Sequence, residues 1–130
     1  MIVLDASAVV DWLLQTSAGL RIESRVFSHQ ETLHAPQLLD LEVTQVLRRL
    51  VLQGIVSERR AGQAVRDLMD LRINRYPHLV LLARVWELRH NFSVYDAAYI
   101  VLAEKLRASL ITRDGKLASP SRHAATVELF

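Results

Sequence analysis

Residues 2–8 read IVLDASA, and this short stretch contains the pattern that decides the fold. Ile2, Val3 and Leu4 form an apolar run without alternation, which is typical of a central parallel strand covered on both faces. Asp5 ends the run, and a helix is predicted over residues 6–14. The chain is therefore expected to begin with a strand that passes directly into a helix, with an acidic side chain at the junction.

The alternation of strands and helices continues to the end of the chain. Pro36 is expected to stop the second strand, Gly54 follows the third helix as a residue beyond a C-cap does, and Ser57 is a candidate N-cap. Further helices are predicted over residues 17–29, 37–53, 58–70, 77–90 and 94–107, and further strands over 33–35, 71–74, 109–112 and 126–129. This order predicts an α/β fold, a three-layer α/β/α sandwich with a mainly parallel central sheet, in one domain over residues 1–130.

Composition excludes several classes of protein and of site. The 130 residues suit one domain, and the absence of cysteine excludes disulfides, thiolate zinc sites and cysteine nucleophiles. The longest apolar run, residues 97–103, is far shorter than the roughly 20 residues of a membrane span, so we expect a cytoplasmic protein without membrane contact. Of 16 basic residues 14 are Arg, which suits contacts with RNA phosphates, although codon usage is an equal explanation.

Two acidic residues follow predicted strands. Asp5 ends the first strand, and Asp114 comes two residues after the strand over 109–112. Sites in open parallel sheets form beyond the carboxyl ends of the strands, so these two carboxylates are expected to face each other across a crevice. A helix cap at Asp5 and a simple turn at Asp114 and Gly115 are the structural alternatives.

Two further acids interrupt apolar helix faces. Glu42 has Leu38, Leu39 and Val46 as its neighbours on one face, and a charge there is costly unless it is paired or binds a cation. Asp96 shares a face with Tyr99, Ile100 and Ala103.

Each of these two acids also has a purely structural explanation. Glu42 can pair with Arg49, and Asp96 can complement a helix dipole. Asp40, on another side of its helix, is expected to be an ordinary solvated acid.

Four carboxylates in one cleft repel one another unless protons or cations lie between them. Ligands that offer only oxygen, without cysteine or suitably spaced histidine, favour hard ions. The predicted cofactor is therefore Mg²⁺ or Mn²⁺.

Four segments together resemble the PIN-domain family. They are IVLDASA at residues 2–8, the proline-to-glutamate segment that ends at Glu42 and Val43, SVYDAAY at 93–99 followed by Leu102 and Ala103, and LITRDGKL at 110–117. They occur in order and at ordinary spacing across nearly the whole chain. A single-domain chain of this length is similar to the VapC toxins of type II toxin–antitoxin systems.

The resemblance implies a function and a site. Asp5, Glu42, Asp96 and Asp114 correspond to the acidic quartet that holds Mg²⁺ or Mn²⁺ in a metal-dependent endoribonuclease, and Ser7 and Thr112 match supporting hydroxyl residues nearby. It also implies an RNA substrate, a cognate antitoxin and a homodimer. Candidate RNA-binding residues, chosen for their position in the sequence, are Arg113, Lys116, Arg48 and Arg49.

Other readings remain open from the sequence. A phosphoaspartate hydrolase places a second aspartate two residues after the first, where this chain has Ser7. A catalytically silent RNA- or protein-binding module would usually lack one of the four acids. A PIN nuclease of RNA processing, outside a toxin–antitoxin pair, has the same acids, and a neighbouring antitoxin gene would distinguish it. An antitoxin groove near Val51, Leu52, Ile55 and Val56 is a further possibility, with a core position as the alternative.

Overall fold

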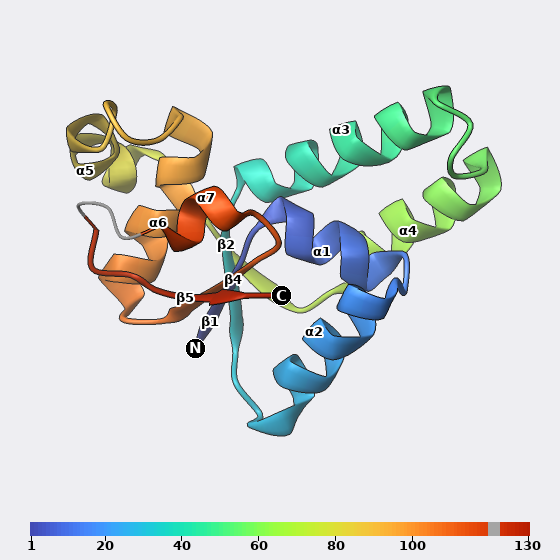
Figure 1. Ribbon diagram of the computed structural model, residues 1–130, viewed down its shortest axis with the longest axis horizontal. Coiled ribbons are helices and arrows are strands. Elements are labelled where there is room, and N and C mark those ends of the chain that lie inside the picture. The colour runs from blue at the N-terminus through green and yellow to red at the C-terminus, as the bar shows by residue number, and fades with distance from the viewer. Residues whose placement is uncertain (120–122) are drawn as a thin grey trace.

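The computed structural model describes residues 1–119 and 123–130, and its strands and helices alternate (Figure 1). The strands are β1 (Ile2–Leu4), β2 (Leu33–Pro36), β3 (Ile73–Tyr76), β4 (Ser109–Thr112) and β5 (Thr126–Leu129). The helices are α1 (Ala6–Leu13), α2 (Ser17–Ser28), α3 (Leu38–Leu52), α4 (Glu58–Asp70), α5 (Leu82–Glu87), α6 (Val94–Leu106) and α7 (Gly115–Ala118), with a 3₁₀ turn η1 (Leu79–Leu81) before α5.

The five strands form one parallel sheet in the order β3-β2-β1-β4-β5. Figure 1 shows α1 and α2 on one side of this sheet and α6 on the other, while α3 and α4 extend outward as a helical hairpin. The predicted three-layer α/β/α architecture is confirmed. Among the helices described, none combines the length and the apolar character needed to traverse a lipid bilayer.

Local sequence signals set the starts of several helices. Asp5, Thr16, Ser57 and Ser93 each accept a hydrogen bond from a backbone N–H in the first turn of the helix that follows, at α1, α2, α4 and α6. The interior of α6 is buried from Ala97 to Ala103, because this helix packs against β1, β2 and β4. Its apolar character on all sides therefore reflects a central position in one layer.

Three boundaries differ from the predictions. Pro36 belongs to β2, because the pairing with β1 ends at His34 and the proline's missing N–H breaks no bond there. The third strand begins at Ile73, since Leu71 still caps α4. The predicted helix over 77–90 is the 3₁₀ turn η1 followed by the short α5.

The topology puts two predicted site residues side by side. β1 and β4 are adjacent, with Leu4 opposite Ile111, and the backbone N–H of Asp5 donates to the carbonyl of Ile111 at 3.2 Å. Because all strands run in the same direction, their carboxyl ends lie at one edge of the sheet, where Asp5 and Asp114 follow.

Candidate active site

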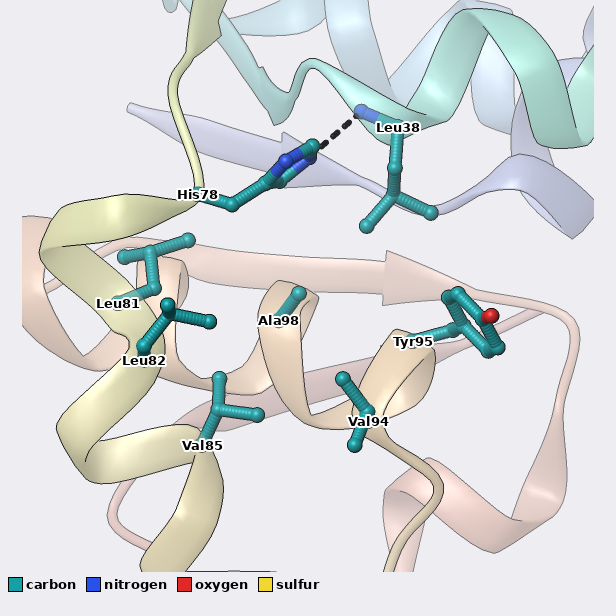
Figure 2. A pocket seen from close by; sticks show the side chains of 8 residues that line it. All are labelled: Leu38, His78, Leu81, Leu82, Val85, Val94, Tyr95 and Ala98. Carbon is teal, nitrogen blue, oxygen red and sulfur yellow. Dashed lines mark hydrogen bonds between the residues drawn. The ribbon is translucent and has the colours of Figure 1, made fainter.

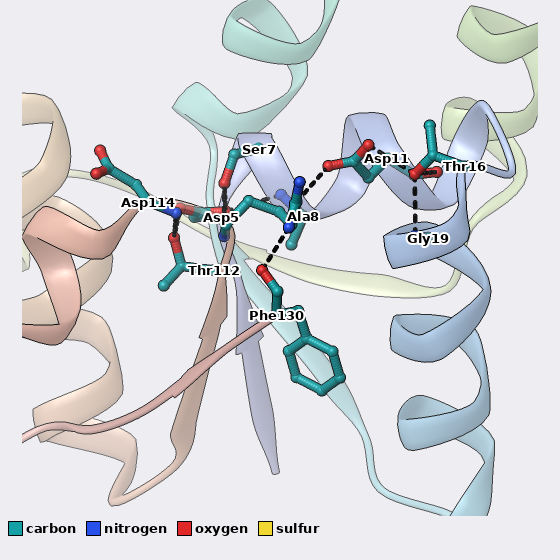
Figure 3. Close-up of polar contacts among 10 residues, drawn as sticks. Asp5, Ser7, Ala8, Asp11, Thr16, Gly19, Thr112, Asp114 and Phe130 are labelled. Atoms are coloured by element: carbon teal, nitrogen blue, oxygen red, sulfur yellow. Dashed lines mark hydrogen bonds and ion pairs between the residues drawn. The ribbon is translucent and has the colours of Figure 1, made fainter.

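Asp5 is the most enclosed acid at this edge, with only 5% of its surface exposed. Its Oδ1 accepts hydrogen bonds from the Ser7 hydroxyl at 2.7 Å and from the backbone N–H of Ala8 at 2.9 Å, while its Oδ2 accepts one from the Thr112 hydroxyl (Figure 3). Asp5 is thus the N-cap of α1 and also part of a polar network. The structural alternative of a helix cap is correct, and it is compatible with a role in the site.

Ser7 and Thr112 join β1 to the segment after β4. The Thr112 oxygen accepts the backbone N–H of Asp114 at 2.9 Å, and the Ser7 oxygen accepts the backbone N–H of Arg113 at 3.0 Å. Asp114 in turn caps α7 through the N–H of Lys116 at 2.9 Å, so the predicted turn at Asp114 is the start of a short helix. These bonds fix the backbone that carries Asp5 and Asp114.

Glu42 comes from α3, and its partner is a tyrosine from α6. The Tyr99 hydroxyl donates to Glu42 Oε1 at 2.6 Å, and the Tyr99 side chain is almost fully buried. Within the described residues no ion pair joins Glu42 to Arg49, so the structural alternative of that pair is wrong. From the sequence, Tyr99 was expected only as part of an apolar helix face. Its phenol, three residues after Asp96, is the one sequence feature that indicates a polar role.

Asp96 lies in the first turn of α6. Its backbone N–H donates to the Ser93 hydroxyl at 3.1 Å, which makes Ser93 the cap of the helix. Asp96 also lines a polar pocket together with Lys116 from α7. Lys116 is thereby brought to the site, as predicted from its position in the sequence.

The carboxylates influence one another's protonation. Burial raises the pKa of Asp5, and the charge of Asp114 raises it further. Burial likewise raises the pKa of Glu42, with smaller contributions from Asp96 and Asp5. For Asp96, burial and the charge of Asp114 raise the pKa, whereas the Ser93 hydroxyl and Lys116 act against the rise. The four acids, called here the acidic quartet, therefore lie close enough for their charges to interact, and a negative charge at Asp5, Glu42 or Asp96 is unfavourable.

The donor set of the acidic quartet fits a hard divalent cation. All its ligand atoms are carboxylate oxygens, and bound positive charge would offset the burial and the repulsion that raise the pKa values of Asp5, Glu42 and Asp96. In the described part of the chain, no three acidic or histidine side chains stand close enough together to enclose an ion as they are. Binding would thus draw the quartet's side chains closer together.

The other predicted RNA-binding residues lie differently. The Arg113 guanidinium donates to Asp11 at 2.8 Å and to the carbonyl of Phe130 at 2.6 Å, so it connects α1 to Phe130. Arg48 and Arg49 are exposed on α3. Their roles in RNA binding stay predictions.

Asp40 differs from its predicted state. It is not an ordinary solvated acid, because both its oxygens accept hydrogen bonds from Arg75, at 2.7 and 2.9 Å. This pair joins α3 to β3. The sequence does not reveal it, since 35 residues separate the partners.

An apolar pocket of about 200 Å³ opens between α5 and α6 (Figure 2). It is lined by Leu38, His78, Leu81, Leu82, Val85, Val94, Tyr95 and Ala98. Among these residues, the backbone N–H of Leu38 donates to His78 Nε2 at 3.2 Å. Leu79, Val80 and Trp86, on the same segments, are also exposed. None of the residues that line this pocket is acidic.

Comparisons with known proteins identify the family of this chain. A family model described as PIN domain matches residues 2–122. Ribonuclease VapC12 of Mycobacterium tuberculosis is 40% identical over 129 residues, which cover 99% of this chain and 98% of the relative. Ribonuclease VapC1 of the same organism is 44% identical over 118 residues, covering 90% and 88%.

Two solved structures share the fold. One is Mycobacterium tuberculosis VapC20, described as a Sarcin-Ricin loop cleaving toxin, with a TM-score of 0.67 and 16% identity over 91% of this chain and 93% of that one. The other is a Pyrobaculum aerophilum protein with a TM-score of 0.71 and 23% identity, covering 97% and 81%.

Proposed function

Because this chain belongs to the PIN-domain family, among relatives named VapC ribonucleases, we propose that it is a metal-dependent endoribonuclease and the toxin of a toxin–antitoxin pair. The observation that carries the proposal is the acidic quartet, in which side chains from four separate segments share one electrostatic environment. Within the described residues, no other group of acids both shares one electrostatic environment and lies near the carboxyl ends of the strands.

The quartet would hold Mg²⁺ or Mn²⁺. Such an ion supplies an activated water for in-line attack on phosphorus and neutralises charge that builds up on the phosphate oxygens. The protein's own residues orient the ligands. Ser7 and Thr112 fix the two oxygens of Asp5, and Tyr99 fixes one oxygen of Glu42. Lys116, beside Asp96, supplies positive charge for an RNA phosphate.

The experiment that tests this proposal is cleavage of purified bacterial tRNA and rRNA with Mg²⁺ or Mn²⁺ and with EDTA. Wild type should give discrete fragments that disappear with EDTA and in Asp96→Asn. A matched control is Asp70→Asn, since Asp70 is an exposed acid at the end of α4, without a hydrogen bond or ion pair in the described residues. Both variants must be folded and free of co-purified antitoxin.

The alternatives predict different results. A catalytically silent RNA- or protein-binding module would leave the RNA intact with either metal. A PIN nuclease of RNA processing would cleave RNA in the same metal-dependent way, but would have no inhibitor encoded beside it. Co-expression with the product of a neighbouring small gene, followed by the same assay, therefore separates the toxin from the processing enzyme.

We also propose a cognate antitoxin, a homodimer and action in the cytoplasm. Leu52 and Ile55, at the end of the α3–α4 hairpin, are 68% and 67% exposed and can contact a partner, whereas Val51 and Val56 are partly buried against the core. The exposed apolar surface in Figure 2 supports a homodimer, since apolar patches of this kind mark protein interfaces. Light scattering on the purified chain should give the mass of two copies, and a monomer at all concentrations would contradict the homodimer.

A further inference from the structure

A second pocket opens directly beside the acidic quartet. Its volume is about 540 Å³, and it is lined by the segment of residues 90–93, by Asp96, by Lys116 of α7 and by Ser119. Since Asp96 and Lys116 belong to this pocket and also to the site, the pocket and the proposed centre of cleavage share a wall. A group bound here would lie next to the bond that is cut.

The lining of this pocket differs from that of the apolar pocket between α5 and α6. His90, Asn91 and Ser93 offer hydrogen-bonding groups, and Phe92 offers an aromatic ring. Pockets of about 300–1,000 Å³ that combine a flat apolar surface with a few polar groups are typical of sites for small organic groups. An unpaired nucleobase has the matching chemistry, because its face stacks on aromatic rings and its edge carries donors and acceptors.

Phe92 is held in place rather than free. Its ring packs against that of His123, with 5.6 Å between the ring centroids and 59° between the planes. Its backbone N–H donates to the carbonyl of Leu88 at 3.1 Å, and its side chain is partly buried against the core. A ring fixed in this way loses little conformational entropy when a base stacks on it.

Charge agrees with a nucleotide as the occupant. The cationic Lys116 lines the pocket together with Asp96, which is the member of the acidic quartet that borders the pocket. A nucleotide with its base against Phe92 and its phosphate toward Lys116 would thus present the phosphate to the quartet.

We propose that this pocket binds one unpaired nucleobase adjacent to the scissile phosphate, stacked on Phe92 and contacted at its edge by Asn91. This inference rests on the proposed ribonuclease function and deepens it. It makes Phe92 and Asn91 specificity-determining residues.

The test measures binding separately from cleavage. A single-stranded RNA oligonucleotide with one 2-aminopurine is titrated with the full chain in EDTA at low ionic strength, and stacking is read as fluorescence quenching. Phe92→Leu should weaken binding by roughly ten-fold or more, since aromatic stacking contributes most of the affinity for a base. Asn91→Ala, a change at an exposed position, should weaken binding less than Phe92→Leu does. It provides the second test of the pocket if Phe92→Leu does not fold. The control is Phe27→Leu, because Phe27 is an exposed phenylalanine on α2.

An oligonucleotide with an abasic site in place of 2-aminopurine should bind wild type as weakly as the intact one binds Phe92→Leu. Absence of quenching by wild type, or equal affinity of wild type and Phe92→Leu for the intact oligonucleotide, would overturn the inference. Cleavage in Mg²⁺ is measured in parallel. Metal-dependent cleavage that is unchanged in both pocket variants would leave the ribonuclease standing without a base pocket, whereas quenching without any cleavage would refute the ribonuclease alone.

Discussion

Replacement of Tyr99 by phenylalanine tests how the site holds Glu42. The change removes one hydroxyl and leaves the buried ring in place, so it deletes the 2.6 Å hydrogen bond to Glu42 Oε1 and little else. A hydrogen bond to a charged group contributes about 1.5–3 kcal/mol. Because Glu42 is only partly buried and water can replace part of the bond, we expect a loss of about 1–2 kcal/mol in the free energy of unfolding.

The expected fall in the melting temperature, Tm, follows from this loss of free energy and from the length of the chain. With about 2.1 cal/mol/K of unfolding entropy per residue, 130 residues give about 0.27 kcal/mol/K, so Tm should fall by about 4–7 °C. Thermal unfolding in EDTA at pH 8 measures it, since a high pH favours the ionised form of Glu42.

The same change should weaken the binding of Mg²⁺. The Tyr99 hydroxyl lowers the pKa of Glu42 against the effect of burial, so its removal raises that pKa and disfavours the ionised carboxylate that would bind the metal. Calorimetric titration with Mg²⁺ should show weaker binding by the variant, and the difference from wild type should shrink as the pH is raised.

Tyr76→Phe is the matched control. The Tyr76 hydroxyl contacts His34 Nδ1 at 2.7 Å, a bond of similar length outside the acidic quartet. This variant should lose stability but bind Mg²⁺ as wild type does. Equal Mg²⁺ affinity of Tyr99→Phe and wild type at every pH, with the variant folded, would refute the positioning role of Tyr99.

Two further predictions concern the scaffold. Gly19→Ala should destabilise the protein by about 1–3 kcal/mol or more in denaturant unfolding, because the added Cβ would lie 1.9 Å from a backbone carbonyl oxygen of α1. The control Gly62→Ala should be neutral or stabilising, because its Cβ would meet only a flexible side chain at 3.6 Å. Equal effects of the two changes would contradict this account of the contact between α1 and α2. Hydrogen bonds from Arg25 lower the pKa of Glu128, and hydrogen bonds from the N-terminal amino group and Arg25 lower the pKa of Glu31. Both acids therefore stabilise the fold at pH values above their ordinary pKa of 4.5. They lose that contribution as the pH falls through their lowered pKa values. Glu128→Gln should therefore cost about 1 kcal/mol at pH 7 and show a shallower loss of Tm from pH 5 to 3, and parallel Tm profiles of variant and wild type would argue against the pair.

The proposed site carries a cost for the fold. Acids whose pKa values are raised by burial destabilise the folded protein as the pH rises through those values, because the folded state then binds more protons than the unfolded state. Bound cation would offset this cost. Enclosed carboxylates at the edge of a stable sheet are thus better explained by ligand binding than by stability.

The sequence by itself determined the layers of the fold and the segments that carry the acids. The unbroken apolar run of β1, the cap at Ser57 and the apolar stretch in α6 are short-range signals, and each agrees with the structure. The position of Asp5 after a strand likewise followed from its immediate neighbours. Such signals are readable because strand and helix periodicity and capping depend on residues within a few positions of one another.

Only the tertiary structure decided which side chains meet. Tyr99 reaches Glu42 across 57 residues, and Thr112 reaches Asp5 across 107. Arg113 pairs with Asp11 across 102 residues. These pairings depend on the strand order β3-β2-β1-β4-β5 and on the packing of α3 and α6 around it. No local pattern encodes them, because a long-range contact forms only when the whole core fixes both partners in place.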